Sequence, residues 1–128
     1  MPGDILVVDD EPSMLDLLKK IFEDEGYNVV TASNAYEAIK ATHKNNFYVI
    51  YLDLNMPDTN GVELCRKIRE KNQFAWITAI TGARSLFEIN ECREAGFDDY
   101  YTKPFDIEVI LGNTEKAFAR IERWKLSK

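Results

Sequence analysis

Three carboxylates follow two apolar runs of this chain. Asp9 and Asp10 come directly after the run at 5–8, and Asp53 comes directly after the run at 49–52. If both runs are parallel strands of one sheet, their carboxyl ends lie side by side, at the edge where open α/β sheets bind ligands. Carboxylates held together repel one another unless they bind a cation, and Mg²⁺ needs only a few such hard oxygen ligands. The pattern predicts a small Mg²⁺ site with one carboxylate free to react.

Asp9 and Asp10 have a second interpretation. A helical pattern begins at Pro12, and aspartate is a favoured residue for capping the start of a helix. Taken alone, the pair fits helix capping as well as it fits metal binding.

A lysine and a threonine close two further apolar runs. Lys103 precedes Pro104, which restricts it to extended backbone geometry, and its ammonium would meet the acidic cluster. Thr81 precedes a glycine that permits close backbone approach, and its hydroxyl can donate to an oxyanion. An ordinary strand-to-helix turn explains Thr81 alone. Beside Lys103 and the carboxylates, it favours an anion-binding site next to a metal.

This inventory matches phosphoryl transfer. The reaction asks a protein mainly for alignment and charge neutralisation, and an aspartate can serve as the acceptor nucleophile. Asp53 is the candidate nucleophile, because the chain must turn at Pro57 and so leaves Asp53 at the tip of a strand. A metal would bridge the carboxylates and the phosphoryl oxygens, while Lys103 and Thr81 would each take a further oxygen.

The elements that must position these residues are strands alternating with helices. Short apolar runs alternate with longer stretches of 3.6-residue periodicity along the whole chain. The predicted strands are 4–8, 28–31, 48–52, 75–81 and 99–102, of which the first and third are the most apolar and therefore central. The first predicted helix starts at Pro12 and stops at Gly26, and the second spans 35–44 behind Ser33 and Asn34. The third follows Asn60-Gly61, the fourth spans 85–95, and the stripe of the fifth runs from Ile107 to Ile121. The pattern predicts one doubly wound α/β domain over residues 1–128.

Apolar residues at helical spacings predict the helix faces that pack on the sheet. They are Met14, Leu17, Leu18, Ile21 and Phe22; Ala38, Ile39 and Thr42; Val62, Cys65 and Ile68; Leu86, Ile89 and Cys92; and Ile107, Ile110, Leu111, Thr114, Phe118 and Ile121. Both cysteines are predicted to be small core residues, and the single histidine, His43, to be solvated near a helix end.

Charge and hydropathy exclude several classes of function. The formal net charge is −6, so the surface as a whole would repel a phosphate backbone, which argues against direct nucleic-acid binding. No apolar run approaches the roughly 20 residues that span a bilayer, and the first residues do not resemble a targeting segment. We therefore predict a cytoplasmic protein that does not bind membranes.

Four motifs resemble the receiver domain of two-component response regulators, the family of the single-domain chemotaxis regulator. They are Val-Val-Asp9-Asp10-Glu-Pro, Leu-Asp53-Leu-Asn-Met-Pro, Thr81-Gly82-Ala83 and Tyr100-Tyr-Thr-Lys103-Pro104-Phe105, in the family's order and at its spacings. The resemblance covers essentially the whole chain and implies a flavodoxin-like (βα)5 fold with strand order 2-1-3-4-5.

The resemblance implies a role for each acidic residue. The residue matching Asp53 receives a phosphoryl group from a sensor histidine kinase, from a phosphotransfer protein or from a small donor such as acetyl phosphate. Mg²⁺, with Mn²⁺ as an alternative, would be held by Asp10, Asp53 and the backbone carbonyl of Asn55, and by Asp9 through water.

The resemblance also implies a switch. Lys103 matches the lysine that contacts the phosphoryl group, and its bond to Pro104 would be cis. Thr81 and Tyr100 match the switch pair, in which the hydroxyl moves to the phosphoryl group and the ring turns inward behind it. The alternative for Tyr100 is a strand aromatic packed on the fourth helix. Tyr101 points to the opposite face of the sheet and is the poorer candidate.

Asn55 and Ala83 match the positions that tune self-dephosphorylation in such domains. Asn55 could orient a water, whereas Ala83 has no polar atom to help. Asn55 also bears on an alternative from the enzyme class, a Mg²⁺-dependent phosphatase with an aspartyl-phosphate intermediate, which would usually need a second aspartate at this position. A further alternative is a pseudo-receiver that binds partners without phosphorylation, against which the complete set of site residues argues.

The output of such a switch is an expectation from the resemblance alone. A downstream effector or output domain would read helix four, strand five and helix five, a face that also serves for homodimers. The basic end after Ile121, with Trp124, fits a helix terminus favourable to the helix dipole, a partner contact or the start of a linker. The predicted protein is a signalling module rather than a metabolic enzyme.

Overall fold

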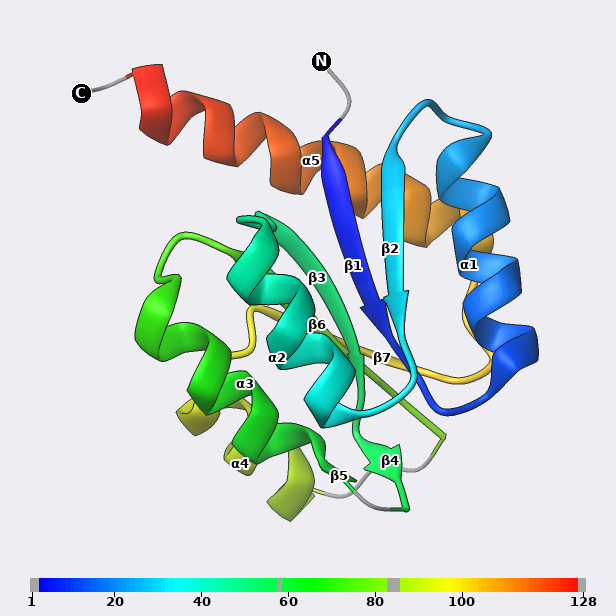
Figure 1. Ribbon diagram of the computed structural model, residues 1–128, viewed down its shortest axis with the longest axis vertical. Coiled ribbons are helices and arrows are strands. Elements are labelled where there is room, and N and C mark those ends of the chain that lie inside the picture. The colour runs from blue at the N-terminus through cyan, green and yellow to red at the C-terminus, as the bar shows by residue number, and fades with distance from the viewer. Residues whose placement is uncertain (1–2, 58, 83–85, 127–128) are drawn as a thin grey trace.

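The protein folds around one sheet of five parallel strands, seen in a computed structural model that describes residues 3–57, 59–82 and 86–126 (Figure 1). The strands are β1 (Asp4–Val8), β2 (Asn28–Ala32), β3 (Val49–Asp53), β6 (Trp76–Thr81) and β7 (Asp99–Thr102). Their order is β2-β1-β3-β6-β7, and all four pairings are parallel. In terms of the five sheet strands this is the predicted order 2-1-3-4-5, so the predicted fold is confirmed.

Five helices in the described ranges cover the two faces of the sheet (Figure 1). They are α1 (Pro12–Glu23), α2 (Ala35–Lys44), α3 (Gly61–Lys71), α4 (Leu86–Ala95) and α5 (Ile107–Leu126). Helices α2, α3 and α4 pack on one face and α1 and α5 on the other, since successive strand residues point to opposite sides. Both central strands are buried on both faces, as their continuous apolar runs predict.

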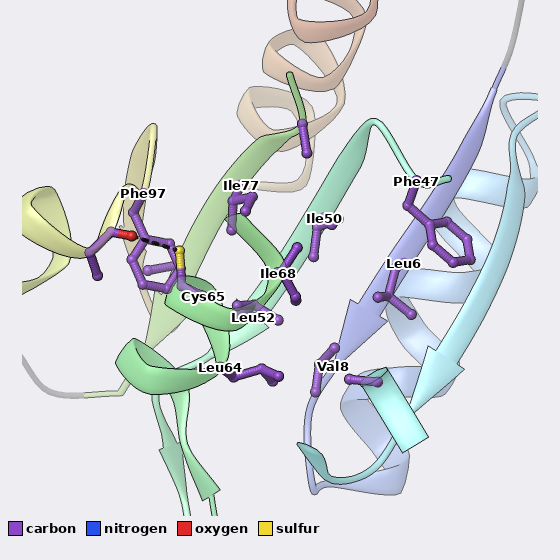
Figure 2. Close-up of a cluster of buried hydrophobic side chains, with 14 of the residues drawn as sticks. Leu6, Val8, Phe47, Ile50, Leu52, Leu64, Cys65, Ile68, Ile77 and Phe97 are labelled. Atoms are coloured by element: carbon purple, nitrogen blue, oxygen red, sulfur yellow. Dashed lines mark hydrogen bonds between the residues drawn. The ribbon is translucent and has the colours of Figure 1, made fainter. Parts of the chain in front are cut away.

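Each face has its own hydrophobic core. On the side of α2, α3 and α4, the core includes Leu6, Ile50, Leu52, Leu64, Ile68 and Ile77 (Figure 2). On the side of α1 and α5, it includes Ile5, Val7, Leu18, Phe22, Val49, Ile80, Ile110 and Ile121. Among the described side chains the buried faces of the helices largely match the predicted stripes, and both cysteines are buried as predicted; the side chain of the predicted Leu86 lies outside the described set.

Two predicted core residues are exposed instead. Leu17 in α1 and Ile107 in α5 each retain 39% of their surface. In α1 the buried positions are Leu18 and Phe22, four residues apart, so Leu17 lies at the margin of the buried stripe. Ile107 occupies the first turn of α5, before the helix reaches the sheet at Ile110. Sequence periodicity predicts which face of a helix is buried, but not how many residues at the margin of that face are covered.

A short hairpin interrupts the connection from β3 to α3, and the sequence analysis did not predict it. Its strands, β4 (Asn55–Met56) and β5 (Thr59–Asn60), pair antiparallel over two residues each. Strands this short show no readable alternation of apolar and polar residues. The hairpin also places Asn60, whose side chain accepts hydrogen bonds from the N–H groups of Val62 and Glu63, as the N-cap of α3.

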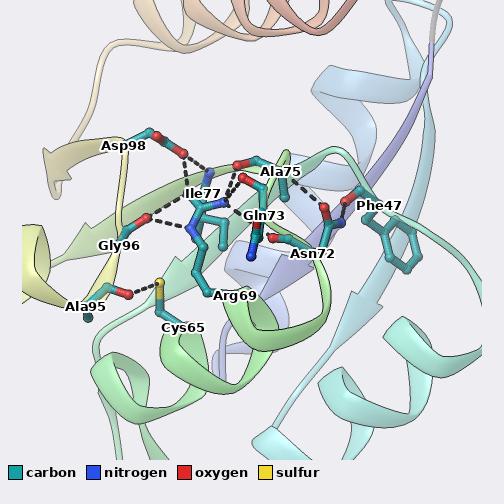
Figure 3. Close-up of polar contacts among 10 residues, drawn as sticks. All are labelled: Phe47, Cys65, Arg69, Asn72, Gln73, Ala75, Ile77, Ala95, Gly96 and Asp98. Atoms are coloured by element: carbon teal, nitrogen blue, oxygen red, sulfur yellow. Dashed lines mark hydrogen bonds and ion pairs between the residues drawn. The ribbon is translucent and has the colours of Figure 1, made fainter. Parts of the chain in front are cut away.

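Arg69 ties α3 to α4 and β6 on the side opposite α1 and α5 (Figure 3). Its guanidinium donates to the carbonyl oxygens of Gly96, at 2.7 and 2.9 Å, and Ala75, at 2.6 Å, and to the Asp98 carboxylate at 2.6 Å. Asp98 also accepts the N–H of Ile77 at 2.9 Å. The Arg69 side chain therefore satisfies the carbonyl group of Gly96, which follows α4, and that of Ala75, which precedes β6.

No helix in the described ranges combines the length and the apolar content that crossing a bilayer requires.

Candidate functional site

The three predicted carboxylates meet at the carboxyl edge of the sheet. Val8 pairs with Leu52 in the β1–β3 register, so Asp9 and Asp53, the next residues of the two chains, are neighbours. One carboxylate oxygen from each of Asp9, Asp10 and Asp53 lies within 4.8 Å of the other two. Asp9 and Asp53 are 2% and 3% exposed, and Asp10 is half-buried. The predicted convergence is confirmed.

Lys103 reaches this cluster from the end of β7, as predicted. Its Nζ lies 3.0 Å from Oδ2 of Asp9 and 3.5 Å from Oδ2 of Asp53. It also lies 3.3 Å from Oε1 of Glu11, a residue that the sequence analysis did not single out. Glu11 directly follows Asp9 and Asp10, so this run of three acidic residues could have identified Glu11 as a further site residue.

The helix-capping interpretation of Asp9 and Asp10 does not hold. The N-cap of α1 is Glu11, whose side chain makes no capping hydrogen bond, and Pro12 supplies the first helical residue. Asp9 accepts the N–H of Glu11 at 2.9 Å, which holds its carboxylate toward the sheet edge rather than over the start of the helix.

Backbone contacts position Asp53. Its Oδ1 accepts the N–H of Asn55 at 3.0 Å, and the next N–H, of Leu54, donates to the carbonyl of Ile80 at 3.1 Å. Gly61, at the start of α3, packs against this segment: a Cβ there would lie 2.9 Å from both the Asp53 carbonyl oxygen and the Leu54 Cα. Only a glycine allows so close an approach of two backbones, a role that the sequence analysis missed.

The charges of the cluster are not balanced by Lys103 alone. Burial raises the pKa of the Asp9 carboxyl, the charge of Asp53 raises it further, and the hydrogen bonds from Glu11 and Lys103 do not cancel this rise. Partial burial lowers the pKa of Lys103, but its hydrogen bond to Asp9 and the charges of Asp53 and Asp9 outweigh burial and raise it. Lys103 therefore stays an ammonium, and its single positive charge faces a cluster of three acidic residues.

The donor set fits a hard divalent cation. Three carboxylates offer oxygen ligands at one point, and their net charge exceeds the single positive charge that faces them. Mg²⁺ takes such ligands and keeps waters in its remaining positions, so three protein oxygens are enough.

Thr81 and Asn55 are joined in this structure. Thr81, the last residue of β6, is fully buried, and its Oγ1 accepts a hydrogen bond from the side-chain amide of Asn55. The backbone of Thr81 accepts the N–H of Lys103 at 2.7 Å, which links the ends of β6 and β7. Asn55 thus contacts two other site residues: its backbone N–H donates to Asp53, and its side-chain amide donates to Thr81.

Tyr100 and Tyr101 lie on opposite faces, as predicted. Tyr100 pairs with Ala79 in the β6–β7 register and packs on the core beneath α4, so it shares a face with Thr81, two residues beyond Ala79. Tyr101 packs on the other core, and its hydroxyl accepts a hydrogen bond from the Asn113 side chain of α5.

Two further predicted residues complete the inventory. The peptide bond between Lys103 and Pro104 is cis, as the resemblance implies. Ala83 lies outside the described residues.

Comparisons with known proteins place the chain in a family. Residues 5–115 match the model of the response regulator receiver domain. The chain is 36% identical over 118 residues to the alkaline phosphatase synthesis transcriptional regulatory protein PhoP of Bacillus subtilis, covering 92% of this chain and 49% of that protein. The chain thus spans about half the length of the curated relatives it matches.

Solved structures agree. A CheY-like response regulator receiver domain protein from Methanospirillum hungatei is 30% identical, with a TM-score of 0.91 over 96% of this chain and 98% of that one. The beryllofluoride-activated NtrC4 receiver domain dimer is 36% identical, with a TM-score of 0.86 over 92% of this chain and 98% of that one. Together with the acidic pocket and its lysine at the carboxyl edge of a 2-1-3-4-5 sheet, the match over most of its length shows that this chain belongs to the response regulator receiver domain family of two-component signalling.

Proposed function

We propose that Asp53 is the phosphoacceptor of this receiver domain and that its phosphorylation switches partner binding through Thr81 and Tyr100. The observation that carries the proposal is the setting of the Asp53 carboxylate. It is buried at a strand tip, one oxygen accepts the Asn55 N–H, and the other faces Lys103. A receiver domain is a signalling module rather than a metabolic enzyme, so its chemistry is confined to gaining and losing this phosphoryl group.

In the proposed reaction, an oxygen of Asp53 attacks the phosphorus of a phosphohistidine on a sensor histidine kinase or a phosphotransfer protein. The new oxygen–phosphorus bond forms as the phosphorus–nitrogen bond breaks, and its electron pair leaves with the imidazole. The N–H of Asn55 holds the attacking carboxylate in place. Lys103 already faces Asp53 Oδ2, so its ammonium can neutralise an incoming phosphoryl oxygen.

Asp10, Asp53 and the backbone carbonyl of Asn55 would hold Mg²⁺, or Mn²⁺ in its place, with Asp9 acting through water. Bound there, the ion supplies charge neutralisation for the phosphoryl oxygens. The cluster geometry supports this assignment, because one oxygen from each aspartate lies within 4.8 Å of the others.

The proposed switch uses the added charge of the phosphoryl group. A phosphoryl group brings up to about two negative charges, which favours the conformer that moves a hydroxyl donor toward it. Thr81 ends β6, the strand next to β3, which ends at Asp53. Tyr100 of β7 pairs with Ala79, two residues before Thr81, and therefore lies on the same face of the sheet as Thr81. Movement of Thr81 would therefore open space into which the half-buried Tyr100 ring can turn.

Two alternatives are less well supported. A pseudo-receiver needs none of the phosphorylation residues, yet the acidic trio gathers within 4.8 Å and Lys103 lies 3.0 and 3.5 Å from two of its members, Asp9 and Asp53. A phosphatase with an aspartyl-phosphate intermediate would use a second carboxylate where Asn55 stands. Asn55 supplies an amide, and that amide is hydrogen-bonded to Thr81.

Partners, assembly and location belong to the same proposal. We propose that the domain acts in the cytoplasm as one unit over residues 1–128, that it does not bind nucleic acid itself, and that it signals to an effector or output domain. We propose that it dimerises through α4, β7 and α5; the dimer of the similar NtrC4 receiver domain supports dimerisation, and the choice of face rests on the family resemblance.

Intact mass spectrometry tests the proposal. We expect incubation with acetyl phosphate and Mg²⁺ to add the mass of one phosphoryl group to the protein and none to Asp53→Ala. No gain in the unaltered protein, with Mg²⁺ binding intact, would instead support the pseudo-receiver. Sustained turnover of an unrelated phosphomonoester, abolished by Asp53→Ala, would support the phosphatase.

A further inference from the structure

An aromatic and basic surface lies at the edge of the sheet where the strands begin. We name it the aromatic–basic patch; its members are Tyr48, Phe74, Trp76, Arg120, Ile121, Trp124 and Lys125. Phe74 and Trp124 are 51% and 55% exposed, and their rings lie 6.4 Å apart. Large aromatic residues exposed together are characteristic of interaction sites rather than of plain surface.

The patch is hollowed. A cavity of about 240 Å³ is lined by Tyr48, Phe74, Ile121, Trp124 and Lys125. Its walls are rings and an aliphatic side chain, and the Lys125 ammonium lies at its margin. A cavity of this size and composition accepts one large apolar side chain, such as phenylalanine or leucine, rather than an extended surface.

Two cations are fixed on the rings of the patch. Lys125 Nζ lies 4.5 Å from the centre of the Tyr48 ring, and Arg120 Cζ lies 5.0 Å from the centre of the Trp76 ring. Cations held over aromatic rings lose part of their conformational freedom before a ligand arrives. The ion pair of Lys125 with Glu122, at 3.7 Å between exposed groups, is weak enough for another carboxylate to replace it.

The charge of this region is opposite to that of the whole protein. Residues 116–126 include Lys116, Arg120, Arg123 and Lys125 but only one acidic residue, Glu122, whereas the chain carries a net charge of −6. An acidic ligand is therefore attracted to this region more strongly than to the protein as a whole. A second copy of this chain docked patch to patch would place these cations against their own copies, so charge disfavours a symmetric dimer.

We propose that the aromatic–basic patch binds an acidic segment of a partner protein that carries one large apolar side chain. The apolar side chain fills the cavity between Phe74 and Trp124, and flanking carboxylates pair with Lys125 and Arg120. The hollow lined by Phe74 and Trp124 accommodates one anchoring side chain, which favours such a segment over an anionic membrane.

The patch is remote from the phosphorylation site. Tyr48 precedes β3 and Asp53 ends it, so the two are five residue steps apart along the strand, roughly 16 Å. Figure 1 shows the C-terminal end of α5 at the opposite end of the sheet from the loop that carries β4. A partner bound at the patch leaves Asp53 accessible, so the two sites can be occupied together.

The two tryptophans make the test direct, because the chain has no others and both belong to the patch. ¹⁵N-labelled protein would be titrated with the blocked peptide acetyl-Glu-Glu-Phe-Glu-Glu-amide while both indole N–H signals are followed by NMR. We expect saturable shifts of the indole signals and of the Phe74 amide. Replacing the peptide phenylalanine by alanine, or its glutamates by glutamines, should weaken binding at least about tenfold.

Variants separate the patch from general effects. Phe74→Ala and Lys125→Gln should each weaken peptide binding about tenfold or more, with unchanged melting temperature because both residues are exposed. Tyr36→Ala is the matched control: Tyr36 is an aromatic residue of α2, 74% exposed and outside the patch, and its loss should leave binding unchanged.

Three outcomes would overturn the proposal. One is the absence of saturable indole shifts in a protein whose spectrum shows it to be folded. Another is a concentration-dependent dimer that Phe74→Ala abolishes, which would assign the patch to a second copy. The last is sedimentation with phosphatidylserine-containing vesicles, lost in Lys125→Gln and without peptide binding, which would assign it to a membrane.

Discussion

Lys103 lies closer to Asp9 than to Asp53: its Nζ is 3.0 Å from the Asp9 Oδ2 and 3.5 Å from the Asp53 Oδ2. Both carboxylates are almost fully buried, so this one ammonium compensates charge that water cannot reach. The looser contact is the one to the proposed phosphoacceptor, where an incoming phosphoryl oxygen can take the place of Oδ2.

Removing this ammonium should make the protein depend on Mg²⁺ for stability. Lys103→Ala leaves two buried carboxylates facing each other, and we expect it to lower the free energy of unfolding by about 2–4 kcal/mol without metal. Saturating Mg²⁺ should then raise the melting temperature of the variant more than that of the unaltered protein. Lys116→Ala, on the exposed side of α5, is the control. Equal responses to Mg²⁺ would show that Lys103 does not compensate the cluster.

Asn55→Ala should favour the activated form. The Asn55 side chain donates to the Thr81 hydroxyl, and that bond must break if Thr81 moves toward a phosphoryl group. A hydrogen bond of this kind contributes about 0.5–1.5 kcal/mol, so beryllofluoride should bind Asn55→Ala roughly two- to tenfold more tightly in calorimetry. The variant keeps the backbone carbonyl proposed as a metal ligand. Weaker binding would mean that the amide supports the activated state instead.

Gly61→Ala tests the packing behind Asp53. The new Cβ would lie 2.9 Å from two backbone atoms, so α3 or the segment after β3 must shift. We expect a loss of about 1–3 kcal/mol in the free energy of unfolding and slower phosphorylation by acetyl phosphate. Gly112→Ala is the matched control, because a Cβ there meets no atom within 4 Å and alanine favours the α5 helix by about 1 kcal/mol. Equal free energies of unfolding for the two variants in urea would show that the close approach at Gly61 does not require a glycine.

Arg69→Met should destabilise the protein far more than Arg66→Met. Arg69 donates to the carbonyls of Gly96 and Ala75 and pairs with Asp98 in a partly buried setting, so its loss leaves several acceptors without a donor (Figure 3). We expect a cost of about 2–4 kcal/mol in urea unfolding. Arg66 pairs with the exposed Glu63 one turn earlier in α3, and its loss should cost under about 0.5 kcal/mol. Similar costs for the two would contradict this account.

Cys65 should impose an alkaline limit on stability. Burial raises the pKa of its thiol from 9.0 to about 12. Above pH 9.0 the thiol ionises in the unfolded chain but not in the folded protein, so stability present below that pH falls by up to about 1.4 kcal/mol per pH unit as the pH rises toward 12. Cys65→Ala lacks this titration, and its urea unfolding free energy should fall less steeply. Parallel slopes for the two proteins would show that the thiol titrates normally.

The sequence carried the alternation of strands and helices and the site because both follow from local patterns, whereas the strand order 2-1-3-4-5 followed from the family resemblance. Short apolar runs that end in threonine or are followed by aspartate or lysine define strands and place polar side chains at one sheet edge. The two central runs, at β1 and β3, are buried throughout as their composition requires. Asp9, Asp53 and Lys103 could therefore be assigned to one point before any distance was known.

Other features depend on contacts between segments far apart in the chain. Asn55 bonds to Thr81 across 26 residues, and Arg69 bonds to Gly96 across 27, and neither pair shows in local periodicity. The hairpin of β4 and β5, the exposure of Leu17, and the aromatic–basic patch likewise arise only when elements pack.

The sequence by itself thus determined which residues gather at the carboxyl edge, because the alternation of strand and helix allows few arrangements of a parallel sheet. Only the tertiary structure decided how those residues are held: that Lys103 sits nearer Asp9 than Asp53, and that Gly61 brings α3 against the Asp53 backbone. Distances of a few tenths of an ångström come from the packing of the whole core, which no local pattern encodes.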